Sequence, residues 1–177
     1  TLVLVDVSVV RCNTLKNSII SNVSRLRPKK IIVVSSAPQI RYPDCYGIDM
    51  SKMHNFVAFQ AMIKLIEEHD KDDLIEKVYY KCIEVLNDEV EPYNPVKELY
   101  AQFSYGDISN KIADIVTPSG TKPKVKVVYQ TLEGLHKACP GHTGDWFFSG
   151  DYPTDGGFKV VCKSFANFYE KKDVRAY

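Results

Sequence analysis

Two short apolar runs near the start of the chain predict buried strands. The first covers residues 1–6, is rich in β-branched residues and ends at Asp6. The second covers residues 31–36, again with isoleucine and valine in succession. Continuous apolar runs of this length are typical of interior strands in a parallel sheet, because both faces of such a sheet are covered.

The segment between these runs predicts a helix. A polar loop over 8–14 leads into apolar residues that recur every three or four positions from about 14 to 26. Asn13 or Thr14 is suited to the N-cap, and Pro28 stops the pattern. A strand, a helix and a second strand in this order form a right-handed βαβ unit, so the sequence predicts an α/β fold with a parallel sheet.

The pattern changes after the second strand. A turn-rich stretch over 37–50 precedes helical spacing over about 53–68 and 71–87. The tail, 139–177, is rich in aromatic residues and glycine and is expected to be ordered but irregular. Two shorter helices and one more strand are expected over 95–102, 107–115 and 125–129.

Composition narrows the class of protein. Of 177 residues, 45% are apolar, which supplies a core and excludes disorder for most of the chain. The 23 basic and 22 acidic residues leave a net charge of +1, so we expect neither nucleic acid nor membrane as a partner. Five scattered cysteines fit a reducing, cytoplasmic compartment. Because a strand needs neighbours and one begins at Thr1, we expect the polypeptide to continue upstream.

Polar residues gather in the loop that follows the first strand. In open α/β sheets, ligands bind at the carboxyl ends of the strands, and the N–H groups at a helix N-terminus favour an anion. A carboxylate at the strand end suits a divalent metal ion or sugar hydroxyls. An ordinary turn with capping residues remains the alternative. The candidates for a sugar-phosphate site are Asp6, Ser8, Arg11, Asn13 and Thr14.

Three segments carry a resemblance to a known family. Residues 3–14 resemble the phosphoribosyl pyrophosphate (PRPP) signature of the phosphoribosyltransferases: an apolar strand, an acidic pair and an Arg-Gly-Thr-Thr turn. The stretch 35–50, with Arg41-Tyr42-Pro43, is similar to the glutamine PRPP amidotransferases, or amidophosphoribosyltransferases. The tail resembles the C-terminus of the same family, from Ala138-Cys139-Pro140 through Tyr152-Pro153-Thr154 to Phe168-Tyr169-Glu170.

The resemblance implies an organisation and a reaction. Residues 1–50 would be the second half of a type I phosphoribosyltransferase core, and 51–177 a mostly helical C-terminal extension with an aromatic, Gly-rich tail. The family transfers ammonia from glutamine to PRPP, giving 5-phosphoribosylamine for purine biosynthesis. A glutaminase domain upstream would supply the ammonia, and homo-oligomers are expected.

The resemblance also assigns roles in the loop. Asp6 would bind Mg²⁺ and the ribose hydroxyls, whereas Ser8, Arg11, Asn13 and Thr14 would bind the 5′-phosphate. Cys12 would contribute its backbone N–H group alone, and Lys16 is a further candidate.

Three positions depart from the family pattern. Val7 replaces the second acid and offers no oxygen to Mg²⁺, so metal binding is expected to be weakened. Cys12 replaces a glycine, which the family needs for close backbone approach, and Asn13 replaces a threonine. These changes leave two other readings open: a non-catalytic module that senses PRPP or nucleotides, and a structural or assembly fragment.

Two metal sites are not expected. Cys139 and His142 have metal-ligand spacing, but no second pair lies nearby in the sequence for a zinc site. Some amidotransferases hold an iron–sulfur cluster through one cysteine after the Arg-x-Pro turn and a Cys-x-x-Cys in the tail. Here Asp44 takes the first place and the tail has no Cys-x-x-Cys, so no cluster is expected.

Overall fold

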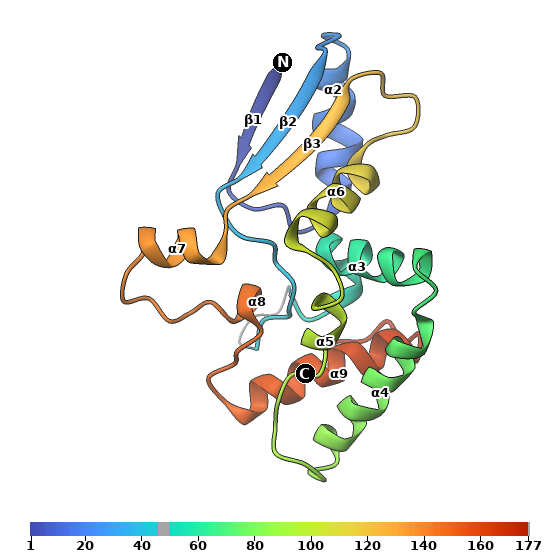
Figure 1. Cartoon of the computed structure of the whole chain (residues 1–177), viewed down its shortest axis with the longest axis vertical. Helices are drawn as coiled ribbons and strands as arrows, with labels where there is room; N and C mark the ends of the chain where they lie inside the picture. Colours follow the sequence, from blue (N-terminus) through green and yellow to red (C-terminus); the bar gives the residue numbers. More distant parts are fainter. Residues whose placement is uncertain (46–49, 177) are drawn as a thin grey trace.

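The computed structural model describes residues 1–45 and 50–176, apart from the side chain of Cys12. Three parallel strands form one sheet in the order β1-β2-β3: β1 Leu2–Asp6, β2 Lys30–Ser35 and β3 Lys124–Tyr129. The register places Asp6 beside Ser35 and Ser35 beside Tyr129, so the three carboxyl ends meet at one edge. The predicted α/β class is confirmed, and the sheet is compatible with a partial phosphoribosyltransferase-like fold (Figure 1).

The first strand differs from its prediction. It lies at an edge of this sheet, and its alternate side chains Val3 and Val5 are 56% and 78% exposed. Helices cover the opposite face, where Ile31 and Val33 of β2 are fully buried. The apolar run predicted a strand covered on both faces, but within the described residues only one face is covered. A run of apolar residues indicates a strand, but it does not determine which other elements pack on each face of the sheet.

The helix after β1 begins earlier than expected. It comprises α1 Cys12–Thr14, a π-helical turn η1 Leu15–Ile20 and α2 Ser21–Ser24. Asn13 and Thr14 therefore lie inside the first turn, and the prediction that one of them caps the helix is wrong. The wider π-helical geometry brings the Ser21 hydroxyl 2.9 Å from the carbonyl oxygen of Lys16, five residues back. Such π-helical turns are rare and occur often at functional sites.

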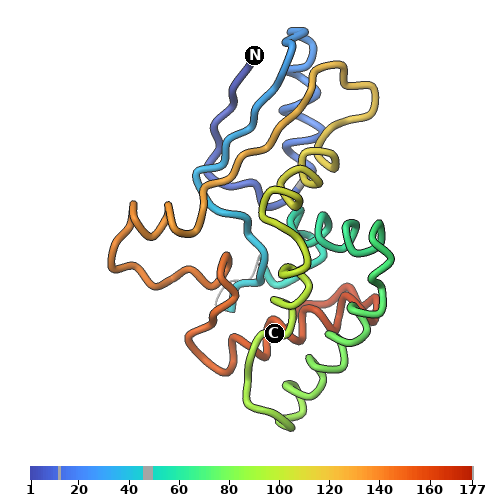
Figure 2. Tube along the Cα trace, viewed as in Figure 1, coloured from blue at the N-terminus to red at the C-terminus, as the bar shows by residue number. Residues whose placement is uncertain are grey.

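Most of the remaining helices lie below the sheet in the view of Figures 1 and 2. The remaining helices are η2 Met53–Asn55, α3 Val57–Glu68, α4 Asp72–Leu86, α5 Lys97–Tyr100, α6 Tyr105–Val116, α7 Leu132–Ala138, α8 Trp146–Ser149 and α9 Asp155–Tyr169. The long helix α9 corrects the expectation of an irregular tail. Its buried residues recur at helical spacing. Gly150 lies in the turn after α8, and Gly156 and Gly157 lie in the first turn of α9.

Aromatic residues join α3 to α9. Phe59 on α3 packs edge-on against Phe165 and Phe168 of α9, with ring centroids 6.2 and 4.8 Å apart. Phe59 and Phe165 are essentially buried, as is the pair Cys82 on α4 and Cys162 on α9. No helix among the described residues is long and apolar enough to cross a membrane.

The third strand of the sheet, β3, comes from residues 51–177, the part of the chain predicted to be a C-terminal extension. Residues 124–129 pair with β2, and α6 packs against β3. The two predicted parts therefore share one sheet. A boundary near residue 50 stays a prediction.

The N-terminus of α6 leads to a prediction about pH. Ser104 and Asp107 form a capping box, in which the Ser104 backbone N–H and hydroxyl donate to the Asp107 carboxylate at 3.0 and 2.6 Å. These hydrogen bonds lower the pKa of Asp107 in the folded chain. The stabilisation is therefore present above the ordinary carboxyl pKa and is lost as pH falls through the lowered value.

We expect Asp107→Asn to make the free energy of unfolding less dependent on pH between about pH 5 and pH 2, by removing this contribution. Urea unfolding of both proteins at several pH values measures the difference. Asp73→Asn, an exposed carboxylate for comparison, should leave the pH dependence closer to that of the parent chain. An unchanged slope in Asp107→Asn would contradict the role of the capping box.

Candidate functional site

The loop after β1 continues the pairing of the two strands. The backbone N–H of Ser36 donates to the carbonyl of Asp6 at 3.0 Å, and that of Ala37 donates to the carbonyl of Val7 at 3.1 Å. The Ser36 hydroxyl also donates to the Val7 carbonyl at 3.1 Å. Val7 thus lies beside the chain that leaves β2, with its side chain 76% exposed.

The middle of the loop is fixed by the neighbouring elements. Val9 is buried, and its carbonyl lies 3.5 Å from the hydroxyl of Tyr129 at the end of β3. The carbonyl of Val10 accepts a 2.8 Å hydrogen bond from the backbone N–H of Val57, the first residue of α3. Residues 9 and 10 therefore hold the loop in place, while the polar residues on either side of them remain near solvent.

Four of the predicted site residues meet at one hollow. It has a volume of about 430 Å³ and lies at the carboxyl end of β1. The Asp6 carboxylate also accepts a 2.8 Å hydrogen bond from the backbone N–H of Val7. The lining residues are Asp6, Ser8, Val9, Val10, Arg11, Thr14, Leu15, Ile19 and Met50.

The other predicted residues are not part of this lining. The side chain of Asn13 is exposed, Lys16 is half-buried, and neither lines the hollow. The side chain of Cys12 lies outside the described residues. The geometry thus brings together Asp6, Ser8, Arg11 and Thr14, and their roles in binding stay predictions.

Sequence reasoning missed a polar cluster in the stretch after β2. Gln39 is buried, and its amide donates to the Tyr105 carbonyl at 3.0 Å and to the Ser109 hydroxyl at 2.9 Å. Its side-chain oxygen accepts from the Arg41 guanidinium at 2.8 and 3.0 Å. That guanidinium lies over the rings of Tyr100 and Tyr105, 4.9 and 5.1 Å from their centroids.

This cluster sets the path of the family-specific stretch. The Tyr105 hydroxyl donates to the Gln130 carbonyl at 2.8 Å and accepts from the Gln39 backbone N–H at 2.9 Å. Burial raises the pKa of Tyr105, which keeps the hydroxyl neutral and able to donate. The sequence feature that could have pointed to this cluster is the resemblance of residues 35–50 to the family. Residues 46–49 of that stretch lie outside the described part.

The tail packs on the same stretch. The backbone N–H groups of Arg41 and Tyr42 both donate to the carbonyl of Phe147, at 2.9 and 3.1 Å. The Tyr152 hydroxyl donates to the Pro43 carbonyl at 2.6 Å. Gly150 has φ of 76°, and a Cβ there would lie 2.8 Å from the Tyr42 ring, so glycine is required for this close approach. Two of the segments that carry the resemblance are therefore in contact.

The tail also holds a histidine–carboxylate pair. Nε2 of His136 lies 2.9 Å from Oδ2 of Asp145, and both residues line a hollow of about 220 Å³ with Cys139 and His142. Within the described ranges, no three His, Cys, Asp or Glu side chains form a group that could hold a metal ion. The expectation that the chain holds no iron–sulfur cluster stays a prediction.

The geometry defines an α/β chain with a polar loop and hollow at the carboxyl edge of a parallel sheet, as in proteins that bind ligands at that edge. Comparison with curated proteins gives relatives named amidophosphoribosyltransferase. The chain is 34% identical to the protein of Pasteurella multocida (strain Pm70) over 92 residues, covering 52% of this chain and 18% of the relative.

Further relatives carry the same name. Identity is 31% over 112 residues with the protein of Haemophilus influenzae (strain ATCC 51907 / DSM 11121 / KW20 / Rd), covering 60% of this chain and 21% of the relative. It is 44% over 55 residues with that of Pseudomonas aeruginosa (strain PAO1), covering 31% and 11%. The predicted resemblance to the amidophosphoribosyltransferases is confirmed. The chain spans about a fifth of the length of the first two relatives. No family model and no solved structure matches the chain.

Proposed function

We propose that this chain is part of an amidophosphoribosyltransferase of purine biosynthesis and that its loop over 6–14 binds PRPP together with Mg²⁺. The observation that carries the proposal is the meeting of Asp6, Ser8, Arg11 and Thr14 at one hollow. The names of the relatives support the reaction class, which transfers ammonia from glutamine to PRPP.

The residues of the hollow suit a sugar phosphate. Thr14 and Ser8 carry hydroxyl groups that donate to phosphate oxygens, and Arg11 supplies a cation. Asp6 lies at the strand end, where its carboxylate accepts from ribose hydroxyls and offers oxygen to Mg²⁺. The 5′-phosphate and the ribose hydroxyls of the ligand thus have partners of the right chemistry in this hollow.

Catalysis in this proposal depends on position and charge. Ammonia forms a bond to ribose C1 while the bond from C1 to the pyrophosphate oxygen breaks, and pyrophosphate leaves with that electron pair. Mg²⁺, when bound, neutralises charge on the leaving group. Asp6 holds the ribose hydroxyls, and the loop residues hold the 5′-phosphate, so the reacting carbon is kept in one place.

The partners of the whole protein belong to the same proposal. Ammonia would come from a glutaminase domain in another part of the polypeptide, and the assembly would be a homo-oligomer in the cytoplasm. The exposed valines of β1 are available for contact with such a part.

A second candidate function is non-catalytic, as a module that senses PRPP or nucleotides. Two departures from the family pattern favour it: Val7 supplies no metal ligand, and Cys12 replaces the glycine that lets the backbone approach the phosphate. Binding without turnover would then be the function of the loop.

Titration calorimetry with PRPP and Mg²⁺ tests the proposal. We expect binding that Asp6→Asn weakens at least tenfold, because one hydrogen bond to a charged group contributes about 1.5–3 kcal/mol. Asp73→Asn is the matched control, since it removes an exposed carboxylate on α4 and should leave binding unchanged. A folded sample that gives no heat would contradict both the enzymatic and the sensing function.

A further inference from the structure

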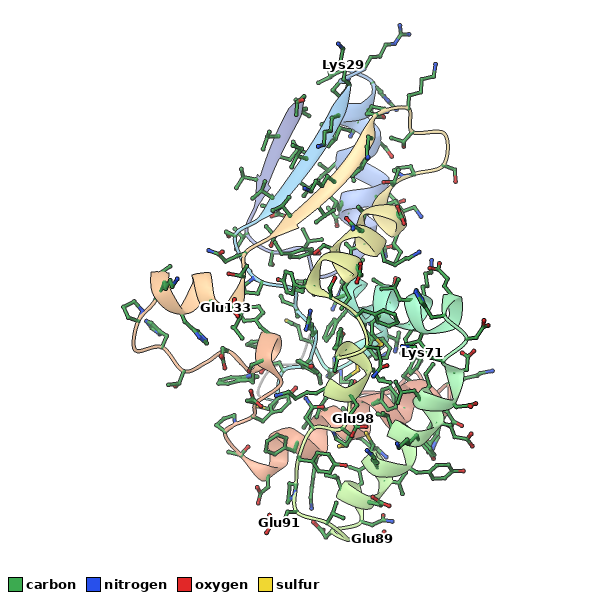
Figure 3. All side chains as sticks on the ribbon, viewed as in Figure 1. Lys29, Lys71, Glu89, Glu91, Glu98 and Glu133 are labelled. Atoms are coloured by element: carbon green, nitrogen blue, oxygen red, sulfur yellow. The ribbon has the colours of Figure 1, made fainter. Side chains whose placement is uncertain are left out.

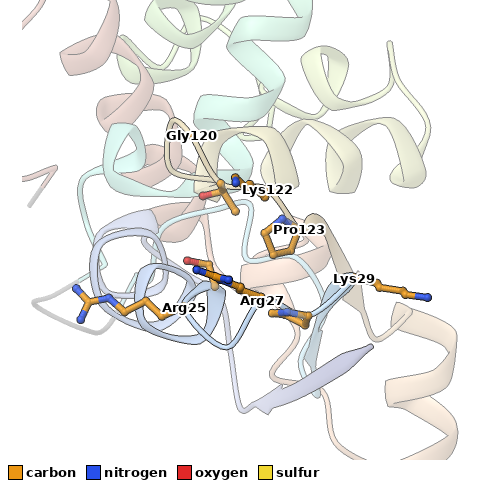
Figure 4. A pocket seen from close by; sticks show the side chains of 9 residues that line it. Arg25, Arg27, Lys29, Gly120, Lys122 and Pro123 are labelled. Carbon is orange, nitrogen blue, oxygen red and sulfur yellow. The ribbon is translucent and has the colours of Figure 1, made fainter.

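A second hollow lies at the opposite end of the sheet, where β2 and β3 begin. Its volume is about 690 Å³, and it lies between the turn after α2 and the loop that leads into β3 (Figure 4). We call it the basic hollow. It is lined by Ser24, Arg25, Arg27, Pro28, Lys29, Gly120, Thr121, Lys122 and Pro123.

Its charge is of one sign. Four of the nine lining residues are basic and none is acidic. The chain has no acidic residue between Asp6 and Asp44 and none between Asp114 and Glu133. In the part of the chain that the structure describes, none of the four basic side chains forms an ion pair with an acidic side chain. The labelled glutamates Glu89 and Glu91 lie at the far end of the molecule from Lys29 (Figure 3).

The strands add two more cations at this end. Lys30 of β2 stands directly beside Lys124 of β3 in the register. Like charges at neighbouring positions of a sheet repel each other and are destabilising. Arg25, by contrast, lies directly after α2, where the C-terminus of a helix favours a cation. The chain as a whole has a net charge of only +1. The cations at this end of the sheet are therefore a local concentration and do not follow from the overall charge of the protein.

The shape of the basic hollow indicates a small ligand. Its volume falls in the range of about 300–1,000 Å³ that is usual for small-molecule sites. Arg27 and Lys122 lie between the two segments, whereas Arg25 and Lys29 extend to either side (Figure 4). The rings of Pro28 and Pro123 give the lining an apolar surface suited to a base or a sugar.

We propose that the basic hollow binds a nucleoside polyphosphate, with Arg27 and Lys122 contacting the phosphate chain. Several phosphates spaced along one ligand match several cations spread across one hollow, and their negative charge offsets the repulsion among the four basic side chains of the lining. The site lies at the amino ends of the strands, apart from the loop of residues 6–14, and does not depend on the function proposed for that loop.

Calorimetric titration of the chain with ATP and with inorganic tripolyphosphate tests this site. We expect both to bind, ATP the more tightly, and the double variant Arg27→Glu/Lys122→Glu to weaken each at least tenfold. The matched control is Lys64→Glu/Lys137→Glu, which makes the same change in net charge at exposed positions elsewhere. A circular dichroism spectrum and a thermal unfolding curve show that each variant is folded.

Other outcomes would overturn the proposal. An equal loss of binding in the control variant would mean that overall charge, and not this hollow, attracts the anion. Loss of ATP binding in Asp6→Asn but not in the Arg27/Lys122 variant would place the ligand at the loop of residues 6–14. Short single-stranded RNA that binds more tightly than ATP would identify the surface as one for nucleic acid. No binding of ATP or tripolyphosphate to the folded parent chain would remove the site.

Discussion

Restoring the family pattern in the loop, with Val7→Asp, Cys12→Gly and Asn13→Thr together, is expected to tighten the binding of PRPP with Mg²⁺ about ten- to ten-thousandfold. The estimate corresponds to regaining one or two hydrogen bonds to charged groups, at about 1.5–3 kcal/mol each. Aspartate at position 7 adds oxygen ligands next to Asp6, and glycine at position 12 lets the backbone approach the phosphate.

The structure describes the side chains of two of the three positions, and both are exposed. Val7 is 76% exposed and Asn13 is also exposed, so substitutions there remove no core packing. Surface substitutions away from special features usually change stability by less than about 0.5 kcal/mol. The changes at positions 7 and 13 should therefore leave the chain folded, and a circular dichroism spectrum of the triple variant shows whether glycine at position 12 is also tolerated.

Calorimetry of the parent chain, the triple variant and a control measures the gain. The control, Val3→Asp, adds a carboxylate at an exposed valine within β1, away from the loop, and should leave binding unchanged. If the triple variant is folded and binds no more tightly than the parent chain, the loop does not have the geometry of a PRPP site. That result would favour the structural reading of this chain.

Removal of one aromatic ring from α9 is expected to have the second large effect. Phe165→Ala should lower the free energy of unfolding by about 3–5 kcal/mol, because truncating a fully buried phenylalanine leaves a cavity in the core. Phe165 packs against Phe59 of α3 and Phe168 of its own helix, with centroids 6.2 and 6.0 Å away. The loss would therefore be felt across the contact between the tail and the helical layer.

Urea unfolding followed by circular dichroism measures this loss. Leu26→Ala serves for comparison, because Leu26 is 72% exposed and its truncation should change stability little. Equal, small effects of the two substitutions would show that α9 does not pack as the structure has it.

The candidate site illustrates which features the sequence predicts. Asp6 follows an apolar run, and Thr14 lies at the start of a helical pattern. These two patterns of neighbouring residues are sufficient to predict a polar loop at the end of a strand. The contacts that hold the loop, from Tyr129 to Val9 and from Val57 to Val10, join residues distant in sequence. No local pattern contains them.

The polar cluster around Gln39 and Arg41 could not be predicted from local sequence for the same reason. Gln39 and Arg41 gain their partners from Tyr100, Tyr105 and Ser109, which are about sixty or seventy positions away in the chain. A buried glutamine cannot be distinguished from a surface one by its neighbours in sequence, because its burial depends on which elements pack above it. The resemblance of residues 35–50 indicated that this stretch is specific to the family, but it did not predict the contacts that these residues make.

The sequence by itself determined the parallel βαβ unit, the helical spacing of α3 and α4, and the family resemblance, because these depend on residues close together in the chain. The tertiary structure alone decided that β1 lies at an edge, that the tail forms α9 and packs on Arg41 and Tyr42, and that the cations of two distant segments share one hollow. Such features depend on contacts between elements, whose free energy comes from burial and charge at positions that periodicity does not connect.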